Sequence, residues 1–213
     1  NNTTLLLNFT NGSLYDFTTN NEVITVGSTQ LRTTVTKYNP TSIYFDGSGD
    51  YLLPSPNAAT LCAFGTGDFT VEFWMNAISF SNADNIKIIF DCRPVSTDGI
   101  YPTIYFYSGQ IRYYVNSADS ITGSTLSTST WYHIALARSG SSTKLFVDGT
   151  QVGSTYTDTN NYLCGASRPV IGARGYTLTD NQYNGYIDDI RITKGLARYT
   201  ATFTPPQGPL PLA

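Results

Sequence analysis

The stretch that decides the fold is Gly185-Tyr-Ile-Asp-Asp-Ile-Arg-Ile-Thr193. Its alternation of β-branched and polar residues is typical of a β-strand, in which successive side chains point to opposite faces. The adjacent acids Asp188 and Asp189 break this alternation, so either one acid points to the apolar face or a β-bulge resets the pattern there. A buried carboxylate needs a partner, and a bound cation would keep it ionised away from water.

Five further stretches have strand-like or end-packing patterns in a fixed order. They are Ser42–Leu52, Gly67–Met75, Trp131–Arg138, Lys144–Gly149 and, after the first stretch, Ala197–Pro206. In this order they resemble the laminin G-like domains that have the concanavalin A-like jelly-roll fold. The resemblance runs from about Leu5 to Pro206 and implies an antiparallel sandwich of two sheets. It says little about the ligand, because one fold carries many functions.

The composition agrees with an all-β chain that contains very little helix. Among 213 residues there are 18 Gly, 10 Pro and 16 Tyr, a composition typical of sandwiches and barrels. Sandwiches of this size are commonly one domain. We therefore expect one jelly-roll domain over residues 1–206 and a Pro-rich linker or tail over 207–213.

Two hairpins are predicted from alternating runs joined by short turns. Thr103–Tyr107 and Ile111–Val115 flank Ser108-Gly109, which suits a tight primed turn, and Trp131–Ala137 pairs with Lys144–Val147. The Ser/Thr-rich segment Asp119–Thr130 is expected to be a loop. A helical turn is expected at Ala58–Cys62, and another in the segment after the last strand, where Tyr199 and Phe203 should pack over the end of the sandwich.

The charge balance argues against two classes of partner. Only 13% of the residues are charged and the net charge is −3, so no basic surface is available for a phosphate backbone and no nucleic acid is expected. No apolar run reaches the roughly 18 residues that a membrane helix needs, so no membrane insertion is expected either.

The three cysteines, Cys62, Cys92 and Cys164, cannot all pair within the chain. Their spacings match neither a zinc site nor a redox pair. The main expectation is three buried thiols, and the alternative is one disulfide, with Cys92 and Cys164 as the more plausible pair.

A structural calcium ion is implied by the resemblance, since related jelly rolls hold one between comparable segments. By that likeness Asp188 supplies the acid, Gly47 and Gly49 supply carbonyls from a glycine turn, and the first strand contributes near Asn8. Calcium accepts such mixed oxygen ligands. The alternative is that Asp188 caps turn amides and binds no metal.

Catalytic patterns are weak. Glycoside hydrolysis needs two carboxyl groups about 5 to 9.5 Å apart, but Glu72 has Thr70 and Trp74 as its neighbours at period 2. We expect Glu72 to pair with an arginine or to lie at a sheet surface. His133 is the only histidine and is expected to be a packing residue, because no Gly-X-Ser-X-Gly elbow accompanies it.

Binding is the remaining function class, because the loops and one hairpin are rich in tyrosine and arginine. Ring faces suit sugar C–H surfaces, and planar donors suit hydroxyls or carboxylates. The alternative is a purely structural role, in which the tyrosines cover the sheet and the arginines are solvated. The candidate binding residues are Arg93, Asp98, Tyr101, Tyr105, Tyr107, Arg112, Tyr114, Arg174, Tyr176 and Asn181.

The sequence therefore predicts a non-catalytic module that binds a glycan or a glycosylated surface receptor. Its ending, Arg191 to Thr200, is similar to modules in phage and marine viral structural proteins, including tail fibres, and in bacterial surface proteins. This implies an extracellular, virion or cell-surface location, with possible oligomerisation through the parent protein. The alternatives are a structural spacer or oligomerisation domain without a small ligand and, in third place, a glycoside hydrolase.

Overall fold

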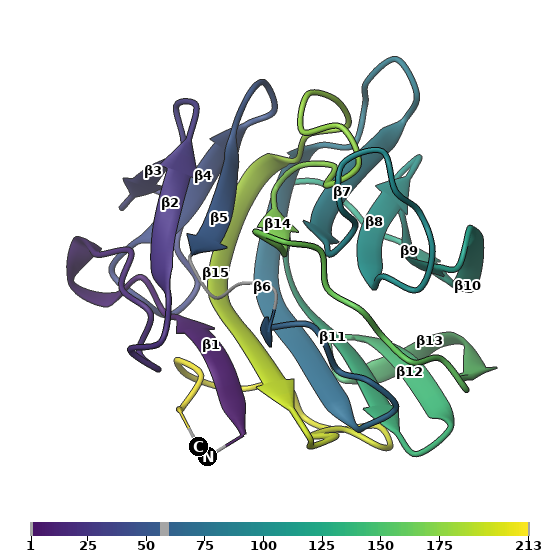
Figure 1. The fold of residues 1–213 in the computed structure, drawn as a ribbon. Coiled ribbons are helices and arrows are strands. Elements are labelled where there is room, and N and C mark those ends of the chain that lie inside the picture. Colours follow the sequence, from purple (N-terminus) through teal and green to yellow (C-terminus); the bar gives the residue numbers. More distant parts are fainter. Residues whose placement is uncertain (1, 56–59, 213) are drawn as a thin grey trace.

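The computed structural model describes residues 2–55 and 60–212, with only the backbone described at positions 11 and 55. Two antiparallel sheets pack face to face (Figure 1), which confirms the expected jelly-roll sandwich. Helix is scarce and includes the short 3-10 turn η1 (Thr10–Gly12).

Sheet A has eight strands in the order β13, β12, β11, β6, β15, β4 and β3, with β1 also pairing with β15. Its strands are β1 (Thr3–Leu7), β3 (Gln30–Arg32), β4 (Ser42–Asp46), β6 (Phe69–Ser79), β11 (Trp131–Ser139), β12 (Ser142–Val147), β13 (Thr150–Thr157) and β15 (Asn184–Lys194).

Sheet B has seven strands in the order β10, β9, β8, β7, β14, β5 and β2. Its strands are β2 (Glu22–Val26), β5 (Tyr51–Ser55), β7 (Ile86–Asp91), β8 (Thr103–Tyr107), β9 (Gln110–Val115), β10 (Ala118–Thr125) and β14 (Val170–Ile171).

Strand β15, which contains the stretch that decides the fold, pairs with β6 on one side and with two strands in succession on the other. Residues 184–187 pair with β4, and residues 190–193 pair with β1. Between these two partners the pairing with β6 shifts its register after Asp188, and Asp189 has a φ of 50°. Of the two alternatives for the adjacent acids, the structure therefore has the bulge, and both acids are fully buried there.

The core lies between the two sheets. Strand β6 is buried on both of its faces, as expected for a central strand with bulky residues at every position. In the hairpin of β8 and β9, Phe106 and Tyr113 point into the core, whereas Tyr105 and Tyr114 lie on the outer face of sheet B. The predicted hairpin is confirmed, and positive φ angles of 49° and 78° at Ser108 and Gly109 give it the primed turn.

One predicted loop is wrong. Strand β10 occupies most of the Ser/Thr-rich segment and pairs with β9. Threonine has a high propensity for β-strands, and Ile121, which is only 2% exposed, packs the segment against the core. The helical turn predicted at 58–62 begins outside the described residues. Strand β1 ends at Leu7, and Phe9, two residues later, has a left-handed backbone conformation.

The C-terminal segment covers part of the outer face of sheet A, over Ala135, Ala137 and Phe146, rather than the end of the sandwich. The rings of Tyr199 and Phe203 stack with their centroids 3.7 Å apart, against Phe146, although without the expected helical turn. The segment predicted to be a linker or tail lies along β1 and β15. There Leu210 is 2% exposed, and Arg191 Nη1 donates to the carbonyl of Pro211 over 2.7 Å.

Candidate functional site

A hollow of about 120 Å³ opens on the outer face of sheet B. It lies where β7 and the β8–β9 hairpin meet the loop after β7 and the loop before β15. Its lining residues are Ile86, Ile88, Arg93, Thr103, Tyr105, Tyr114, Arg174 and Asn181.

Two tyrosines of the hairpin form one wall. The rings of Tyr105 and Tyr114 meet edge to face with centroids 6.3 Å apart. The Tyr105 hydroxyl donates to Asp119 over 2.6 Å, and the Tyr114 hydroxyl donates to Asp98. Burial and these hydrogen bonds raise the pKa of both phenols, so both remain neutral donors. The carboxylates thus fix the orientation of both rings.

Arg93 forms a second, rigid wall. Its guanidinium binds Asp91 through Nη2 at 2.7 Å and through Nε, and its side chain is 5% exposed. Burial lowers the pKa of Arg93, but the hydrogen bonds and charge of Asp91 outweigh burial and hold the pKa above its usual value. The guanidinium carbon lies 5.1 Å from the centre of the Tyr114 ring, close enough for a cation–π contact.

The loop before β15 supplies the remaining polar groups. Arg174 is 31% exposed, pairs with Asp180 at 3.1 Å and lies over the Tyr176 ring. The carbonyl of Asn181 accepts a hydrogen bond from the Ile88 amide over 2.8 Å, which ties this loop to β7. Arg174 is therefore the most solvent-accessible cation of the hollow, held on an anchored loop.

The structure brings together part of the predicted binding set. Arg93, Tyr105, Tyr114 and Arg174 line the hollow, together with Asn181. The others support it or lie elsewhere: Asp98 and Tyr176 contact lining side chains, Tyr101 packs against the core, and Arg112 lies over the exposed Tyr107 ring and pairs with Asp119.

Sequence reasoning missed the floor of the hollow, which Ile86, Ile88 and Thr103 form. A register shift between Ile88 and Phe90 in the pairing of β7 with β8 changes which side chains face outward. A simple period-2 count along β7 does not reveal such a shift.

Glu72 lies inside the protein rather than in a groove. It is fully buried, and its carboxylate accepts hydrogen bonds from Arg191 Nε (2.9 Å) and from the Tyr199 hydroxyl (2.7 Å). His133 Nε2 lies 3.2 Å from the same carboxylate, and its ring is also fully buried. The expected pairing with an arginine and the packing role of the histidine are both confirmed.

The segments implied for calcium are only partly brought together. Asp188 accepts hydrogen bonds from the amide of Lys37 (3.2 Å) and from Asn39 Nδ2 (2.9 Å). The same Asn39 nitrogen lies 3.1 Å from Asp189. Burial raises the pKa of both acids, and the neighbouring charge of Asp188 helps to raise that of Asp189 to about 8.

Three buried oxygen atoms in this region accept no hydrogen bond: Oδ1 of Asn8, Oδ1 of Asn39 and Oδ2 of Asp189. Leu210 links the set, because its carbonyl accepts from Asn8 Nδ2 over 2.9 Å and its amide bonds the Asp189 carboxylate. Hard oxygen atoms without donors are what a calcium ion binds. The residues present therefore fit a calcium site formed by Asp188, Asp189, Asn39 and Asn8.

The glycine turn does not reach this set. Asp46 pairs with Asn184, so Gly47 lies against the Asn184 side chain, four residues from Asp188 along β15. The Gly49 amide donates to Gln182 over 2.7 Å. The register of β4 against β15 therefore places Gly47 and Gly49 away from Asp188, contrary to the implied arrangement, and Asn39 contacts the Asp188 carboxylate instead.

Comparison with known proteins identifies the fold family. A sequence model described as the concanavalin A-like lectin/glucanases superfamily matches residues 45–197, most of the chain. None of the curated proteins matches this sequence.

Solved structures agree on the fold. Domain 4 of an extracellular arabinanase from Geobacillus stearothermophilus, in complex with arabinotriose, is similar with a TM-score of 0.68 and 16% identity over 92% of this chain and 93% of that one. The receptor-binding domain of botulinum neurotoxin D is similar with a TM-score of 0.69 and 19% sequence identity, over 92% of this chain and 50% of that one. The binding domain of Paraclostridial Mosquitocidal Protein 1 is similar with a TM-score of 0.69 and 16% sequence identity, over 92% of this chain and 49% of that one. This chain thus spans about half of each toxin domain.

Within residues 2–55 and 60–212, no helix has the length and apolar character needed to cross a bilayer.

Proposed function

Because this chain belongs to the concanavalin A-like lectin/glucanase superfamily, we propose that it is a non-catalytic module that binds a carbohydrate or a glycosylated receptor. The observation that carries the proposal is the hollow on sheet B, where the rings of Tyr105 and Tyr114 adjoin the guanidinium groups of Arg93 and Arg174. Ring faces pack against sugar C–H surfaces, and guanidinium groups bond hydroxyls or carboxylates.

The dimensions of the hollow suggest how much of a glycan it holds. Ligand pockets for drug-sized molecules are about 300–1,000 Å³, so a hollow of about 120 Å³ takes a single ring or one end of a chain. A site of this size binds weakly on its own, and useful affinity then comes from several copies presented together. That is consistent with a module of a larger surface protein or of a viral structural protein resembling a tail fibre, located outside cells or on a virion.

Two similar solved structures support this class of function. The arabinanase domain was solved in complex with arabinotriose, and the toxin fragment is named as a receptor-binding domain. The buried position of Glu72, bonded to Arg191, supports a non-catalytic role, because a catalytic carboxyl group must reach the substrate.

We also propose a structural calcium ion at the bulge of β15. Asn8, Asn39 and Asp189 would offer oxygen atoms that otherwise lack donors. Asp188 would add a carboxylate that already accepts hydrogen bonds from Asn39 and from the Lys37 amide. Bound calcium would neutralise two buried carboxylates and tie β15 to the first strand and to the loop before β4.

A glycan array tests the binding proposal. We expect a signal from the wild-type protein displayed in several copies, and at least about a tenfold loss in Tyr114→Ala and in Arg174→Ala, because each removes a main contact. Tyr15→Ala is the matched control, since Tyr15 is an exposed tyrosine outside the lining of the hollow. Circular dichroism confirms that each variant is folded.

Absence of signal across broad arrays would refute the proposal. Clean self-association in light scattering combined with that absence would favour the structural spacer or oligomerisation domain instead. Hydrolysis of a soluble β-glucan by the wild-type protein would establish an enzyme.

A further inference from the structure

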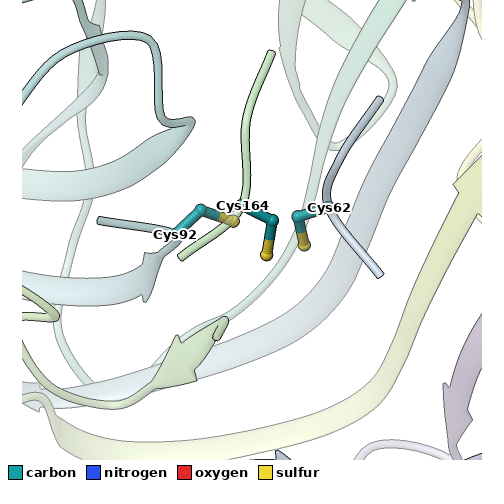
Figure 2. A group of neighbouring side chains, drawn as sticks. All are labelled: Cys62, Cys92 and Cys164. Carbon is teal, nitrogen blue, oxygen red and sulfur yellow. The ribbon is translucent and has the colours of Figure 1, made fainter. Parts of the chain in front are cut away.

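The three cysteines converge although they lie far apart in the sequence. Cys62 precedes β6, Cys92 follows β7 directly, and Cys164 lies in the loop before β14. Their Sγ atoms all lie within 4.8 Å of one another, and Figure 2 shows the three side chains side by side, each from a different segment. None forms a disulfide. The sequence spacing gave no hint of this arrangement, because the contacts are made by folding alone.

Backbone hydrogen bonds hold the three segments together. The Gly165 amide donates to the carbonyl of Cys92 over 3.0 Å, next to Cys164. Gly65, three residues after Cys62, exchanges two hydrogen bonds with Tyr162, of 3.1 and 2.8 Å. The thiols therefore meet because the main chain places them there, which is the preorganisation that a metal site requires.

A buried arginine lies beside the cluster, because Cys164 Sγ is 3.4 Å from the carbonyl oxygen of Arg168. Arg168 is 4% exposed, and the hydrogen bonds of its guanidinium go to the carbonyls of Arg93, Ser167 and Gly175, at 2.7 to 2.9 Å. It belongs to none of the ion pairs within the described residues. A buried cation bonded only to carbonyls is costly unless an anion is near. Asp91 is the first of the anions whose charge acts on it, followed by Cys164 and Cys92.

The distances suit a metal ion with little movement. A metal–sulfur bond of about 2.3 Å places three sulfur atoms about 3.8–4.0 Å apart in a tetrahedral or trigonal site. The observed limit of 4.8 Å requires a closure of 1 Å or less, whereas a disulfide requires two sulfur atoms to approach to about 2.05 Å.

The set of donors selects the class of ion. Within the described residues, no histidine or carboxylate joins the three sulfur atoms. Thiolates select soft or borderline ions such as Cu(I) and Zn(II) over calcium or magnesium. Three thiolates complete a trigonal Cu(I) site. Zn(II) takes four ligands, and the side of the half-buried Cys164 is where water could supply the fourth.

We propose that Cys62, Cys92 and Cys164 bind one thiophilic metal ion, Cu(I) or Zn(II), which fastens the loops before β6 and β14 to the end of β7. The ion would also fix the start of the loop that carries Arg93, one residue after Cys92, and so stabilise one wall of the hollow. The site is separate from the calcium set, whose ligands are oxygen atoms.

The test uses the whole chain, purified under reducing, oxygen-free conditions and stripped of metal. Zn(II) and Cu(I) are added in separate titrations while sulfur-to-metal absorption in the ultraviolet and the melting temperature are recorded. We expect saturation at one equivalent, a rise in melting temperature, and protection of all three thiols from alkylation.

Cys62→Ser, Cys92→Ser and Cys164→Ser should each abolish binding at one equivalent. Cys164→Ser is the mildest change, because Cys164 is the least buried of the three. Glu22→Gln, at an exposed acid on β2, is the control and should bind the thiophilic ion as the wild type does. Should a buried serine prevent folding, alkylation of the wild-type protein with and without metal still decides the question.

Two results would overturn the proposal. One is a folded wild-type protein that binds neither ion at one equivalent. The other is found in protein isolated without reductant: a mass lower by two hydrogen atoms, with only one thiol open to alkylation after denaturation, would show that two of the cysteines pair in a disulfide.

Discussion

Two neighbouring strands carry buried carboxylates that the protein treats in opposite ways. Glu72 on β6 accepts bonds from Arg191 and Tyr199 and contacts His133, so its charge is matched by groups of the chain. Asp188 and Asp189 on β15 are equally buried, yet neither appears in an ion pair within the described residues, and Asp189 Oδ2 has no donor.

The pKa directions express this difference. Burial raises the pKa of Glu72, but the hydrogen bond from His133 and the charge of Arg191 outweigh burial and place the pKa below its usual value. For Asp189, burial and the charge of Asp188 act together and raise the pKa to about 8. Groups of the chain therefore neutralise the charge of Glu72, whereas the pair Asp188 and Asp189 needs a proton or a cation from solution.

The largest expected effect is a pH dependence that Asp189→Asn removes. Without calcium, the folded protein keeps a proton on Asp189 up to about pH 8, whereas the unfolded chain loses it near 3.8. The stability due to this proton is therefore complete below pH 3.8 and is lost as the pH rises through about 8. Relative to wild type, Asp189→Asn should gain up to about 5 kcal/mol between pH 4 and 9.

Urea unfolding of both proteins in the presence of a chelator measures this difference. A constant offset between the two proteins at every pH would contradict the raised pKa.

Next in size is Glu72→Ala, which leaves Arg191 buried without its carboxylate. Breaking a buried ion pair on one side costs about 3–5 kcal/mol, and urea unfolding at pH 7 measures it. Glu22→Ala is the control, because the only other glutamate of the chain is exposed on β2 and should change stability by less than about 0.5 kcal/mol. An equal loss of unfolding free energy in both variants would show that the buried contacts of Glu72 do not stabilise the protein more than an exposed glutamate does.

Calcium bound at Asp188 and Asp189 should stabilise the protein by less than Glu72→Ala destabilises it. At a concentration one hundred times the dissociation constant, the gain is about 2.7 kcal/mol. Differential scanning calorimetry in calcium, compared with a chelator, measures it. Asp189→Asn should lose most of the gain and Glu72→Gln should keep it. An unchanged melting temperature of the wild-type protein at millimolar calcium would exclude the proposed ion.

The smallest expected effect is the loss of the hydrogen bond from Tyr199 to Glu72. Tyr199→Phe keeps the ring that stacks on Phe203 and removes only the hydroxyl that donates to Glu72. We expect a loss of about 1.5 kcal/mol, the value for a hydrogen bond to a charged group. Tyr15→Phe is the exposed control in the same unfolding assay. No loss in Tyr199→Phe would mean that Arg191 and His133 alone satisfy the carboxylate.

Local pattern predicted the features that depend on neighbours in sequence. Adjacent acids in a β-branched run indicated the bulge, and Ser108-Gly109 indicated the hairpin that carries Tyr105 and Tyr114. Features set by strand register were not predictable. Asn39 reaches Asp189 across 150 positions, and the cysteines meet only through the packing of three loops. A shift of one residue in the register of β4 against β15 would change the partners of Asn39 without changing any local pattern.

The bulge of β15 also has an optical consequence. Trp74 is the β6 partner of Asp188, is 3% exposed, and carries the Lys37 ammonium 4.2 Å above its ring, while the Lys37 amide bonds to Asp188. Indole emission responds to charges this close. The protein therefore contains an intrinsic fluorescent reporter beside the acids, and ion uptake at the bulge can be followed without any label.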